Sequence, residues 1–434
     1  MEPWLSRAAR VHPERAALVT PRQTWSYREL HAAAGAVAGA LHEWGIGHGD
    51  RVGLALPSDE LIVALHACLA IGAAAVPIDL RLTDAERVVR LNGVARTLTE
   101  LPSGPPAAER PLDLSDTATV MYTSGTTAGP KRVELSLSNW LWNAIGSAVA
   151  LGLDPEERWL CPMPLAHVGG LSIALRSAIY GTTVVLHERF DTDAVRDALL
   201  DPRQRVTLVS LVPTMLGRLL DAGLREPPAL RRVLLGGGPI APALLARARE
   251  ASIKVAPSFG MTETCSQIAT DGIALFGAEL TLSDAGELLV RGPSVARGAI
   301  SGDGWLHTGD LGRFDESGRL EIVGRTADTI VSGGENVAPT EVEAVLVEHD
   351  AISDAAVVGR ADPEWGEIVV ALIVPRLGWV SGHPDGAAID GAMAEDLREF
   401  CGARLAGFKV PKRFELVESL PRGTTGKLQR RELH

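Results

Sequence analysis

Helical and strand-like segments alternate along most of the chain, and this alternation limits its possible folds more than any other feature. Residues 26–29 and 83–86 both have the Ser/Thr-x-x-Glu spacing of a capping box, and each opens an apolar stretch of helical period. Short buried strands are predicted at residues 51–56, 74–78, 182–186, 206–211 and 232–235. Strands that alternate with helices form a largely parallel sheet covered by helices. The predicted fold class is therefore α/β, with layered α/β subdomains.

The pattern of elements changes after about residue 278. Short β-rich runs are then separated by turn sequences such as Asp-Glu-Ser-Gly, which is typical of hairpins. These runs are residues 287–291, 305–308 and 313–323. We expect them to form a small β-rich subdomain.

A further unit is predicted beyond Gly324. A helix begins at Pro339, and two strands and a second helix follow it at residues 355–358, 368–374 and 394–405. Roughly 110 residues are enough for a small α+β domain. We therefore predict an N-terminal domain of residues 1–325 and a C-terminal domain of residues 326–434.

The composition excludes several classes of protein. With 46% hydrophobic and 22% charged residues, the 434-residue chain has the balance of an ordinary globular protein rather than a disordered one. Its net charge of -12 argues against a protein that coats nucleic acid, because phosphate neutralisation needs an excess of positive charge. An anionic ligand must therefore meet positive charge that is concentrated locally.

The cysteines and the apolar segments predict a cytoplasmic protein. The four cysteines are far apart in sequence, so no CxxC zinc or redox pair exists and disulfides are not expected. The N-terminus lacks the uninterrupted apolar stretch of an export signal. The most apolar run, residues 61–76, is shorter than the ~20 residues that span a bilayer, so we expect a buried helix leading into a strand and no membrane insertion. A homo-oligomer remains open.

The strongest chemical signal is a Gly/Thr-rich loop that follows the β-rich residues 118–122. Its glycines allow close approach of the backbone, and its hydroxyls and terminal lysine can bind phosphate oxygens. Only five of the 42 basic residues are lysines, so a lysine in this loop favours a site that needs a compact ammonium charge rather than a planar guanidinium. The spacing is not that of a Walker A loop, and a flexible surface turn is the alternative. The candidate phosphate ligands are Thr123, Ser124, Gly125, Thr126, Thr127 and Lys131.

Two further segments lie where predicted strands end. Residues 258–263 place a carboxylate just beyond a hydroxyl-rich turn, which suits Mg²⁺ because this ion prefers oxygen ligands. Residues 235–239 contain three glycines, which leave room for a flat ring at the end of a strand. A helix N-terminus without a metal and a tight strand-to-helix turn are the respective alternatives.

Four other candidates carry chemistry on loops or strand ends. Asp310 and Arg325 could bracket vicinal hydroxyls, although a surface ion pair has the same sequence pattern. Lys427 lies on a second Gly/Thr/Lys loop, for which a solvated basic tail is the alternative. His167 is a lone histidine on a Pro/Gly-bounded loop, and such a residue more often has a structural role. Because Lys131 and Lys427 are nearly 300 residues apart, two domains are expected to close around one phosphate group.

Taken together and in this order, these segments resemble the adenylate-forming superfamily of acyl- and aryl-CoA synthetases, luciferases and nonribosomal adenylation domains. Residues 123–131 resemble its phosphate-binding core, and residues 259–263 its aromatic-Gly-x-Thr-Glu motif. Residues 308–310, residues 324–325 and Lys427 match its ribose, hinge-side and catalytic-lysine motifs. The resemblance covers nearly the whole chain and implies the fold of this superfamily, with a mobile C-terminal lid.

Within the superfamily, the chain is most similar to the o-succinylbenzoate-CoA ligases of menaquinone biosynthesis. The segments that carry this similarity are residues 164–171, 179–186, 234–240 and 260–268. Three positions depart from the usual pattern, namely Ala128, Arg132 and Ala327. The first two leave the phosphate donors intact, and the third argues only against a charged hinge residue.

The resemblance implies an acid-CoA ligase with two half-reactions and with ATP, Mg²⁺ and coenzyme A as partners. A carboxylate attacks the α-phosphorus of ATP and releases pyrophosphate, and the thiol of coenzyme A then captures the acyl-adenylate. The implied ATP-binding residues are those of the phosphate loop with Gly237, Gly238, Pro239, Ser258, Phe259, Gly260, Met261, Thr262, Glu263, Asp310 and Arg325. Glu263 and Thr126 are the implied metal ligands.

The same resemblance assigns the catalytic and coenzyme A-binding residues. Lys427 is implied to stabilise the charge that develops between the carboxylate and the α-phosphate, and His167 is a second catalytic candidate. A rotation about a hinge near residues 325–328 is implied to replace Lys427 with the loop of Ser332, Gly333 and Gly334, which faces coenzyme A.

The second carboxylate of succinylbenzoate needs a partner in a buried pocket. From its position after His167, Arg176 is the expected ion-pair partner. The remaining substrate-binding candidates are His167, Gly236, Thr264 and Ser266.

Three rival functions remain open from the sequence. The first is a ligase for another aryl or fatty acid, and the second is a non-catalytic nucleotide-binding homologue. The third is a kinase or P-loop ATPase, which the missing Walker A pattern disfavours.

Overall fold

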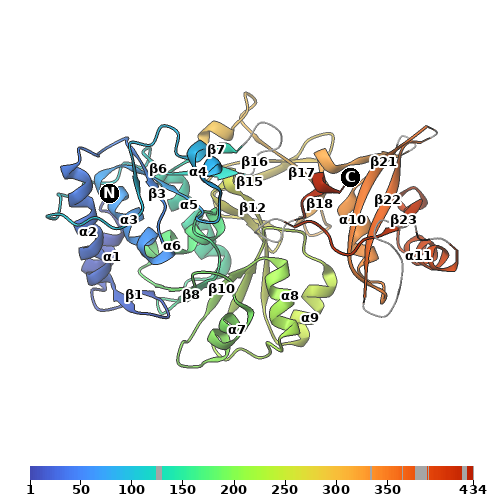
Figure 1. Ribbon diagram of the computed structural model, residues 1–434, viewed down its shortest axis with the longest axis horizontal. Helices are drawn as coiled ribbons and strands as arrows, with labels where there is room; N and C mark the ends of the chain where they lie inside the picture. Colours follow the sequence, from blue (N-terminus) through green and yellow to red (C-terminus); the bar gives the residue numbers. More distant parts are fainter. Residues whose placement is uncertain are drawn as a thin grey trace. The chain divides into compact units, whose positions relative to one another are not determined.

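The computed structural model describes residues 1–123, 130–332, 335–363, 365–376, 389, 391–422 and 428–433 (Figure 1). The chain divides into two compact units. The first comprises Met1–Gly237, Arg247–Leu280 and Val290–Leu306, and the second comprises Gly238–Ala246, Thr281–Leu289 and His307–His434. The domain boundary expected at residues 325 and 326 stays a prediction. Within the described ranges, no helix is long and apolar enough to cross a bilayer.

The largest sheet of the first unit has the strand order β14-β13-β12-β11-β10-β8-β9-β1-β2. Its strands are β1 (Ala16–Val19), β2 (Thr24–Ser26), β8 (Arg158–Cys161), β9 (Thr183–Leu186), β10 (Leu208–Leu211), β11 (Arg232–Leu235), β12 (Val255–Met261), β13 (Ser266–Thr270) and β14 (Ile273–Ala274). Neighbours from β12 to β1 run parallel, and the outer pairs are antiparallel. This arrangement confirms the predicted α/β sheet.

Helices connect the parallel strands of this sheet, as the alternating sequence predicts. They are α6 (Val168–Tyr180), α7 (Thr192–Leu200), α8 (Pro213–Asp221) and α9 (Pro242–Glu250). The four-residue strands β8, β9, β10 and β11 are predominantly or wholly buried. Such continuous apolar strands are expected where a parallel sheet is covered on both faces.

A second sheet of the first unit has the order β5-β3-β4-β6-β7. Its strands are β3 (Arg51–Leu54), β4 (Ala74–Pro77), β5 (Arg96–Leu98), β6 (Thr117–Thr123) and β7 (Lys131–Ser136). The pair β6 and β7 is antiparallel, so the Gly/Thr-rich loop connects two adjacent strands. The predicted position of this loop at a strand end is confirmed.

Local sequence signals account for the remaining helices of the first unit, which are α1 (Trp4–Val11), α2 (Tyr27–Glu43), α3 (Ser58–Ile71), α4 (Asp84–Arg90) and α5 (Leu137–Leu151). Both predicted capping boxes are present, at Ser26 before α2 and at Thr83 before α4. Every residue of α3 from Leu61 onward is buried, and the helix ends at Gly72 in a left-handed conformation with φ of 75°. The apolar run is therefore a core helix leading into β4, as predicted.

A four-stranded sheet has the order β15-β16-β17-β18, with β15 (Glu279–Leu282), β16 (Glu287–Arg291), β17 (Leu306–Phe314) and β18 (Leu320–Arg325). It corresponds to the hairpins predicted after residue 278. The following sheet of the second unit contains β19 (Ile330–Ser332), β20 (Glu335–Val337), β21 (Ile352–Asp362), β22 (Gly366–Pro375) and β23 (Arg413–Leu416). Helices α10 (Pro339–Leu346) and α11 (Ala392–Gly402) contribute Val342, Leu346 and Leu397 to its core, which confirms the predicted α+β class.

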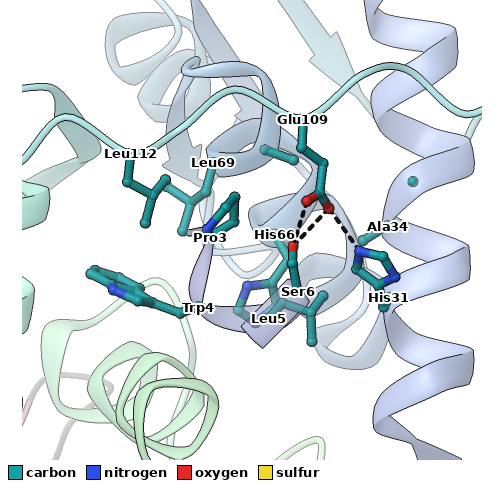
Figure 2. Close-up of a pocket in the computed structure, with 12 residues that line it drawn as sticks. Pro3, Trp4, Leu5, Ser6, His31, Ala34, His66, Leu69, Glu109 and Leu112 are labelled. Carbon is teal, nitrogen blue, oxygen red and sulfur yellow. Dashed lines mark hydrogen bonds and ion pairs between the residues drawn. The ribbon is translucent and has the colours of Figure 1, made fainter. Parts of the chain in front are cut away.

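A polar cluster near α1 is structural. Figure 2 shows that the Ser6 hydroxyl and the His31 ring both point to the carboxylate of Glu109. Each lies 2.7 Å from a carboxylate oxygen. A nucleophile–base–acid triad would need the histidine in the middle, whereas here the carboxylate is in the middle. The cavity beside it has a volume of about 10 Å³, close to the smallest that admits one water molecule. This cluster is therefore not a catalytic site.

Candidate functional site

The ends of the Gly/Thr-rich loop are held together by strand pairing. Thr123 and Lys131 are opposite one another in the register of β6 and β7. The side chain of Lys131 is 59% exposed, and its Nζ lies 3.7 Å from Oε1 of Glu263. Two segments that the sequence analysis treated separately are thus adjacent. The predicted ligands Ser124, Gly125, Thr126 and Thr127 lie outside the described residues.

The segment around Glu263 differs from its predicted conformation. Residues 258–261 do not form a turn but continue strand β12, because they pair antiparallel with β13. The turn is the 3₁₀ segment Thr262–Thr264, in which the Glu263 residue is only 8% exposed. A Cβ on Gly260 would lie 1.9 Å from the carbonyl oxygen of Ser266, so this position requires glycine.

The hydroxyl of Thr264 is already bonded within this turn. It accepts from the Met261 amide at 3.0 Å and lies 2.8 Å from the Ser266 carbonyl oxygen, to which it donates. A hydroxyl has one proton to donate. In this conformation Thr264 therefore uses its proton within the turn, and its expected contact with the substrate stays a prediction. Cys265 and Ser266 follow at φ of 59° and 93°, a strained conformation for residues other than glycine.

The chemistry of the Glu263 site fits a magnesium ion that is bound together with nucleotide. Its described donor is one buried carboxylate, that of Glu263. The described ranges hold no cluster of three or more histidine, cysteine, aspartate or glutamate residues that could bind a metal by itself. Mg²⁺ is commonly held by one or two carboxylates and by substrate phosphates rather than by an all-protein cage. The second predicted ligand, Thr126, is outside the described residues.

The turn after β11 provides a close approach between two strand ends. The Ser258 hydroxyl donates to the Leu235 carbonyl at 3.2 Å. A Cβ on Gly236 would lie 2.6 Å from the Ser258 Oγ, and Gly237 has φ of 80°, a region that favours glycine. The sequence Gly236-Gly237 is therefore required by this turn. Whether Gly237, Gly238, Pro239 and Phe259 contact adenine stays a prediction.

A fully buried arginine lies on α6. Arg176 is 1% exposed, and its Nη2 donates to Oδ1 of Asn143. Among the residues that the structure describes, its buried Nε and Nη1 find no hydrogen-bond partner. Its guanidinium lies 5.5 Å from the ring of Trp159. Burial lowers the pKa of Arg176, but an arginine remains charged in a protein. A buried cation with two open donors can bind an anion.

Asn143, the partner of this arginine, belongs to a network of neutral polar groups from α5 and β13. The Asn143 amide donates to the Gln267 carbonyl at 2.8 Å, and the Ser147 hydroxyl donates to the Gln267 side-chain oxygen at 3.1 Å. Asn143 and Gln267 are not among the site residues expected from the sequence. A signal was present, because Asn139, Asn143 and Ser147 form a polar stripe with a spacing of four on a mostly apolar helix.

His167 occupies the N-cap position of α6 and makes no side-chain capping bond. Its Nε2 lies 3.9 Å from Oδ2 of Asp79, which is too far for a hydrogen bond. Burial lowers the pKa of His167, and the charge of Asp79 opposes this shift. The ring is therefore held mainly neutral and can act as a hydrogen-bond donor or acceptor.

In the second unit, Asp310 and Arg325 are paired across strands β17 and β18. They are opposite in the register, and the Arg325 Nε lies 2.9 Å from Oδ1 of Asp310. Asp310 is 4% exposed, and its amide is bonded to the Thr308 hydroxyl at 3.1 Å. The structure thus brings these two predicted residues together in a fixed ion pair. Their contact with a ribose stays a prediction.

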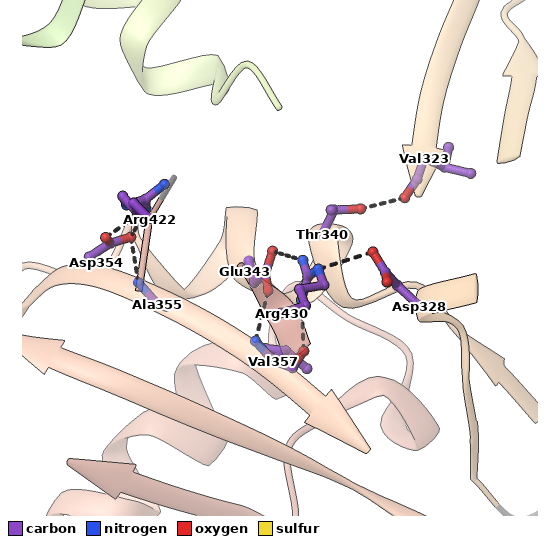
Figure 3. Close-up of polar contacts among 9 residues, drawn as sticks. All are labelled: Val323, Asp328, Thr340, Glu343, Asp354, Ala355, Val357, Arg422 and Arg430. Carbon is purple, nitrogen blue, oxygen red and sulfur yellow. Dashed lines mark hydrogen bonds and ion pairs between the residues drawn. The ribbon is translucent and has the colours of Figure 1, made fainter. Parts of the chain in front are cut away.

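Two arginines of the second unit anchor the chain on either side of residues 423–427 (Figure 3). Arg422 pairs with Asp354 at 2.7 Å, and Arg430 pairs with Glu343 at 2.7 Å and with Asp328 at 3.1 Å. The backbones of Arg422 and Leu428 form an isolated β-bridge. Lys427, Gly333 and Gly334 lie outside the described residues. Ser332 is buried at the end of β19.

Comparisons with known proteins agree with these motifs. The family model for the AMP-binding enzyme matches residues 5–99 and 93–299, and the model for the AMP-binding enzyme C-terminal domain matches residues 341–427. The 2-succinylbenzoate–CoA ligase of Bacillus licheniformis is 37% identical to this chain, and the match covers 99% of this chain and 98% of that protein. The 2-succinylbenzoate–CoA ligase of Geobacillus kaustophilus is 39% identical, and the match covers 100% of this chain and 97% of that protein. The solved structure of o-succinylbenzoate CoA synthetase from Bacillus subtilis, in complex with the acyl-adenylate intermediate OSB-AMP, has a TM-score of 0.88 and 35% identity, and the match covers 100% of this chain and 98% of that one.

Proposed function

Because the chain belongs to the AMP-binding enzyme family, we propose that it is an ATP-dependent 2-succinylbenzoate–CoA ligase that acts in menaquinone biosynthesis. The membership confirms the resemblance drawn from the sequence motifs and the predicted fold class. The reaction converts the acid to an acyl-adenylate with release of pyrophosphate, and then to the CoA thioester with release of AMP.

The observation that supports this acid substrate is the environment of Arg176. Succinylbenzoate has two carboxylates, of which one is activated and the other is carried unchanged. A buried guanidinium with open Nε and Nη1 donors can bind the unchanged carboxylate through two charge-assisted hydrogen bonds. A simple benzoate or a fatty acid would leave this buried cation unpaired, which disfavours those substrates. His167, Gly236 and Ser266 remain proposed neighbours of the acid.

The proposed nucleotide site is built from the phosphate loop and Glu263. Lys131 and the loop hydroxyls would hold the β- and γ-phosphates, and Lys131 beside Glu263 balances one charge of the site. Glu263 would hold Mg²⁺, which when bound reduces the repulsion between the phosphates and the incoming carboxylate. The rigid turn of Thr262–Thr264 keeps the Glu263 carboxylate in place, which preorganises it for this role.

The catalytic and coenzyme A roles are assigned by the family motifs. Lys427 would donate to the attacking carboxylate and the α-phosphate, where negative charge shifts from the acid oxygen to the departing pyrophosphate. In the second half-reaction, the thiol sulfur forms a bond to the acyl carbon and the bond to AMP breaks. Ser332, Gly333 and Gly334 would line the path of coenzyme A. A rotation about residues 325–328 would exchange these two groups, and the Arg430–Asp328 ion pair is one contact that such a hinge must accommodate.

The cytoplasmic location and a homo-oligomeric state stay predictions. The rival function in this family is a ligase for another aryl or fatty acid. The test is to incubate the purified chain with ATP, Mg²⁺ and coenzyme A and to measure AMP and CoA thioester with 2-succinylbenzoate, benzoate and a fatty acid. We expect AMP and thioester with 2-succinylbenzoate only. Equal rates with benzoate would exclude the proposed specificity. Formation of ADP instead of AMP would support a kinase. No nucleotide turnover with any acid would indicate a non-catalytic homologue.

A further inference from the structure

A second positively charged site lies in the first unit, in a cleft of about 450 Å³. We call it the arginine cleft. Its lining includes Arg15, Glu156, Arg158, Thr183, Arg203 and Arg205. This volume falls within the range of about 300–1,000 Å³ that is typical of small-molecule sites. Four arginines in one cleft are unexpected in a chain whose net charge is -12.

The arginine cleft is distinct from the candidate nucleotide site. Arg158 and Thr183 are the first residues of β8 and β9, which run parallel to β10 and β11. The cleft is thus at the amino edge of the sheet, whereas the Gly236 turn follows the last residue of β11. Four-residue strands separate these two edges by about 13 Å. Ligands of α/β enzymes bind at the carboxyl edge, so the cleft has no part in the proposed reaction.

The charges in the arginine cleft are only partly balanced. Arg15 pairs with Glu156 at 2.6 Å, and Arg203 pairs with Asp201 at 3.0 Å. Arg158 donates to the Gln204 carbonyl at 2.6 Å, which carries no formal charge. In the part of the chain that the structure describes, neither Arg158 nor Arg205 makes an ion pair with a carboxylate. Two cationic side chains therefore remain available.

Arg158 and Arg205 both line the cleft, and their charges interact. Burial lowers the pKa of Arg158, and the positive charge of Arg205 acts in the same direction. Like charges repel in the absence of an anion, so an anion between them would relieve this repulsion. Arg205 also has φ of 46°, a left-handed conformation that is uncommon for residues other than glycine. The loop thus holds Arg205 at the cleft in spite of local repulsion and backbone strain.

We propose that the arginine cleft binds a small molecule that carries a multiply charged phosphate group, with Arg158 and Arg205 as its ligands. The planar guanidinium group presents paired N–H donors that match phosphate oxygens. Arg15 borders the same cleft, where it is paired with Glu156. The cleft is larger than a single phosphate ion, so the phosphate is one group of a larger ligand. This inference does not depend on the identity of the acid substrate.

The test uses inorganic pyrophosphate as the probe and the full-length protein at constant ionic strength. Hydrogen–deuterium exchange, followed by mass spectrometry, reports separately on residues 156–159 and 201–207 at the cleft and on residues 258–263 at the nucleotide site. We expect pyrophosphate to slow exchange in the two cleft segments. A double variant, Arg158→Gln with Arg205→Gln, should require at least about tenfold more pyrophosphate for the same protection, because each charged hydrogen bond contributes about 1.5–3 kcal/mol.

A charge-matched control separates local binding from net charge. The double variant Arg225→Gln with Arg249→Gln removes two exposed arginines elsewhere in the first unit. In this control, pyrophosphate should slow exchange in the cleft segments as much as it does in the wild type. The cleft variant should keep its rate of AMP formation. If the cleft double variant does not fold, the single variant Arg205→Gln, at an exposed position, serves for the same test. The proposal is overturned if pyrophosphate leaves the cleft segments of the wild type unprotected, or if the cleft variant is protected as strongly as the control.

Discussion

Substitution of Arg176 by methionine tests whether the buried guanidinium recognises substrate. Methionine fills a similar volume without a charge. If the free carboxylate of 2-succinylbenzoate bonds to Nε and Nη1, the variant loses charge-assisted hydrogen bonds worth about 1.5–3 kcal/mol. The value of kcat/KM for this acid should therefore fall by about 10- to 100-fold. Benzoate has no second carboxylate, so its kcat/KM should not fall.

The same substitution should have little effect on the stability of the ligand-free protein. Removal of a buried, partly unpaired cation relieves its desolvation, which favours the variant. The loss of the bond to Asn143 leaves one buried amide oxygen without its donor, which costs about 1–3 kcal/mol. Because these two effects oppose each other, the Tm of Arg176→Met should stay within a few degrees of the wild type.

Arg231 provides a matched control, because it is a partly buried arginine that does have an acidic partner. It is ion-paired with Glu157, which is only 2% exposed. Arg231→Met should leave a buried carboxylate unpaired and lower stability by about 1–3 kcal/mol, with no change in the preference between the two acids. The assay is steady-state AMP release with both acids, together with thermal unfolding. The recognition role of Arg176 is refuted if Arg176→Met keeps kcat/KM for 2-succinylbenzoate within about threefold of the wild type.

Three further outcomes are expected. Lys427→Ala should slow adenylation by on the order of 10² to 10³ while sparing thioester formation from supplied acyl-adenylate, and equal losses in both half-reactions would contradict an exchange of the lid domain. Burial lowers the pKa of His66 to about 4. As the pH falls below about 6.5, His66 therefore binds a proton in the unfolded chain but not in the folded chain. Stability should therefore drop by about 3 kcal/mol between pH 6.5 and 4, and denaturant titrations should show a smaller drop for His66→Gln. Gly260→Ala should lower the free energy of unfolding by about 1–3 kcal/mol or more, because its Cβ would overlap the Ser266 carbonyl, and an unchanged denaturation midpoint would show that the strand can shift.

Much of the fold was predictable because its signals are local. The capping boxes at Ser26 and Thr83 bond residues only three apart, and both are present. The strand of residues 232–235 is bounded by its own sequence and was predicted to the residue. The Gly/Thr-rich loop was placed correctly at a strand end because the apolar residues before it have β propensity.

The sequence by itself determined the α/β class, the family and the residue types of the nucleotide site, since these depend on short motifs and on hydrophobic period. Only the tertiary structure decided that residues 258–261 are a strand, because β13 supplies their hydrogen bonds. It also decided that the Thr264 hydroxyl is consumed by its own turn and that Arg176 meets the amide of Asn143 from another helix. Whether a buried polar group is satisfied or left open for a ligand depends on neighbours far away in the sequence, and folding alone brings those neighbours together.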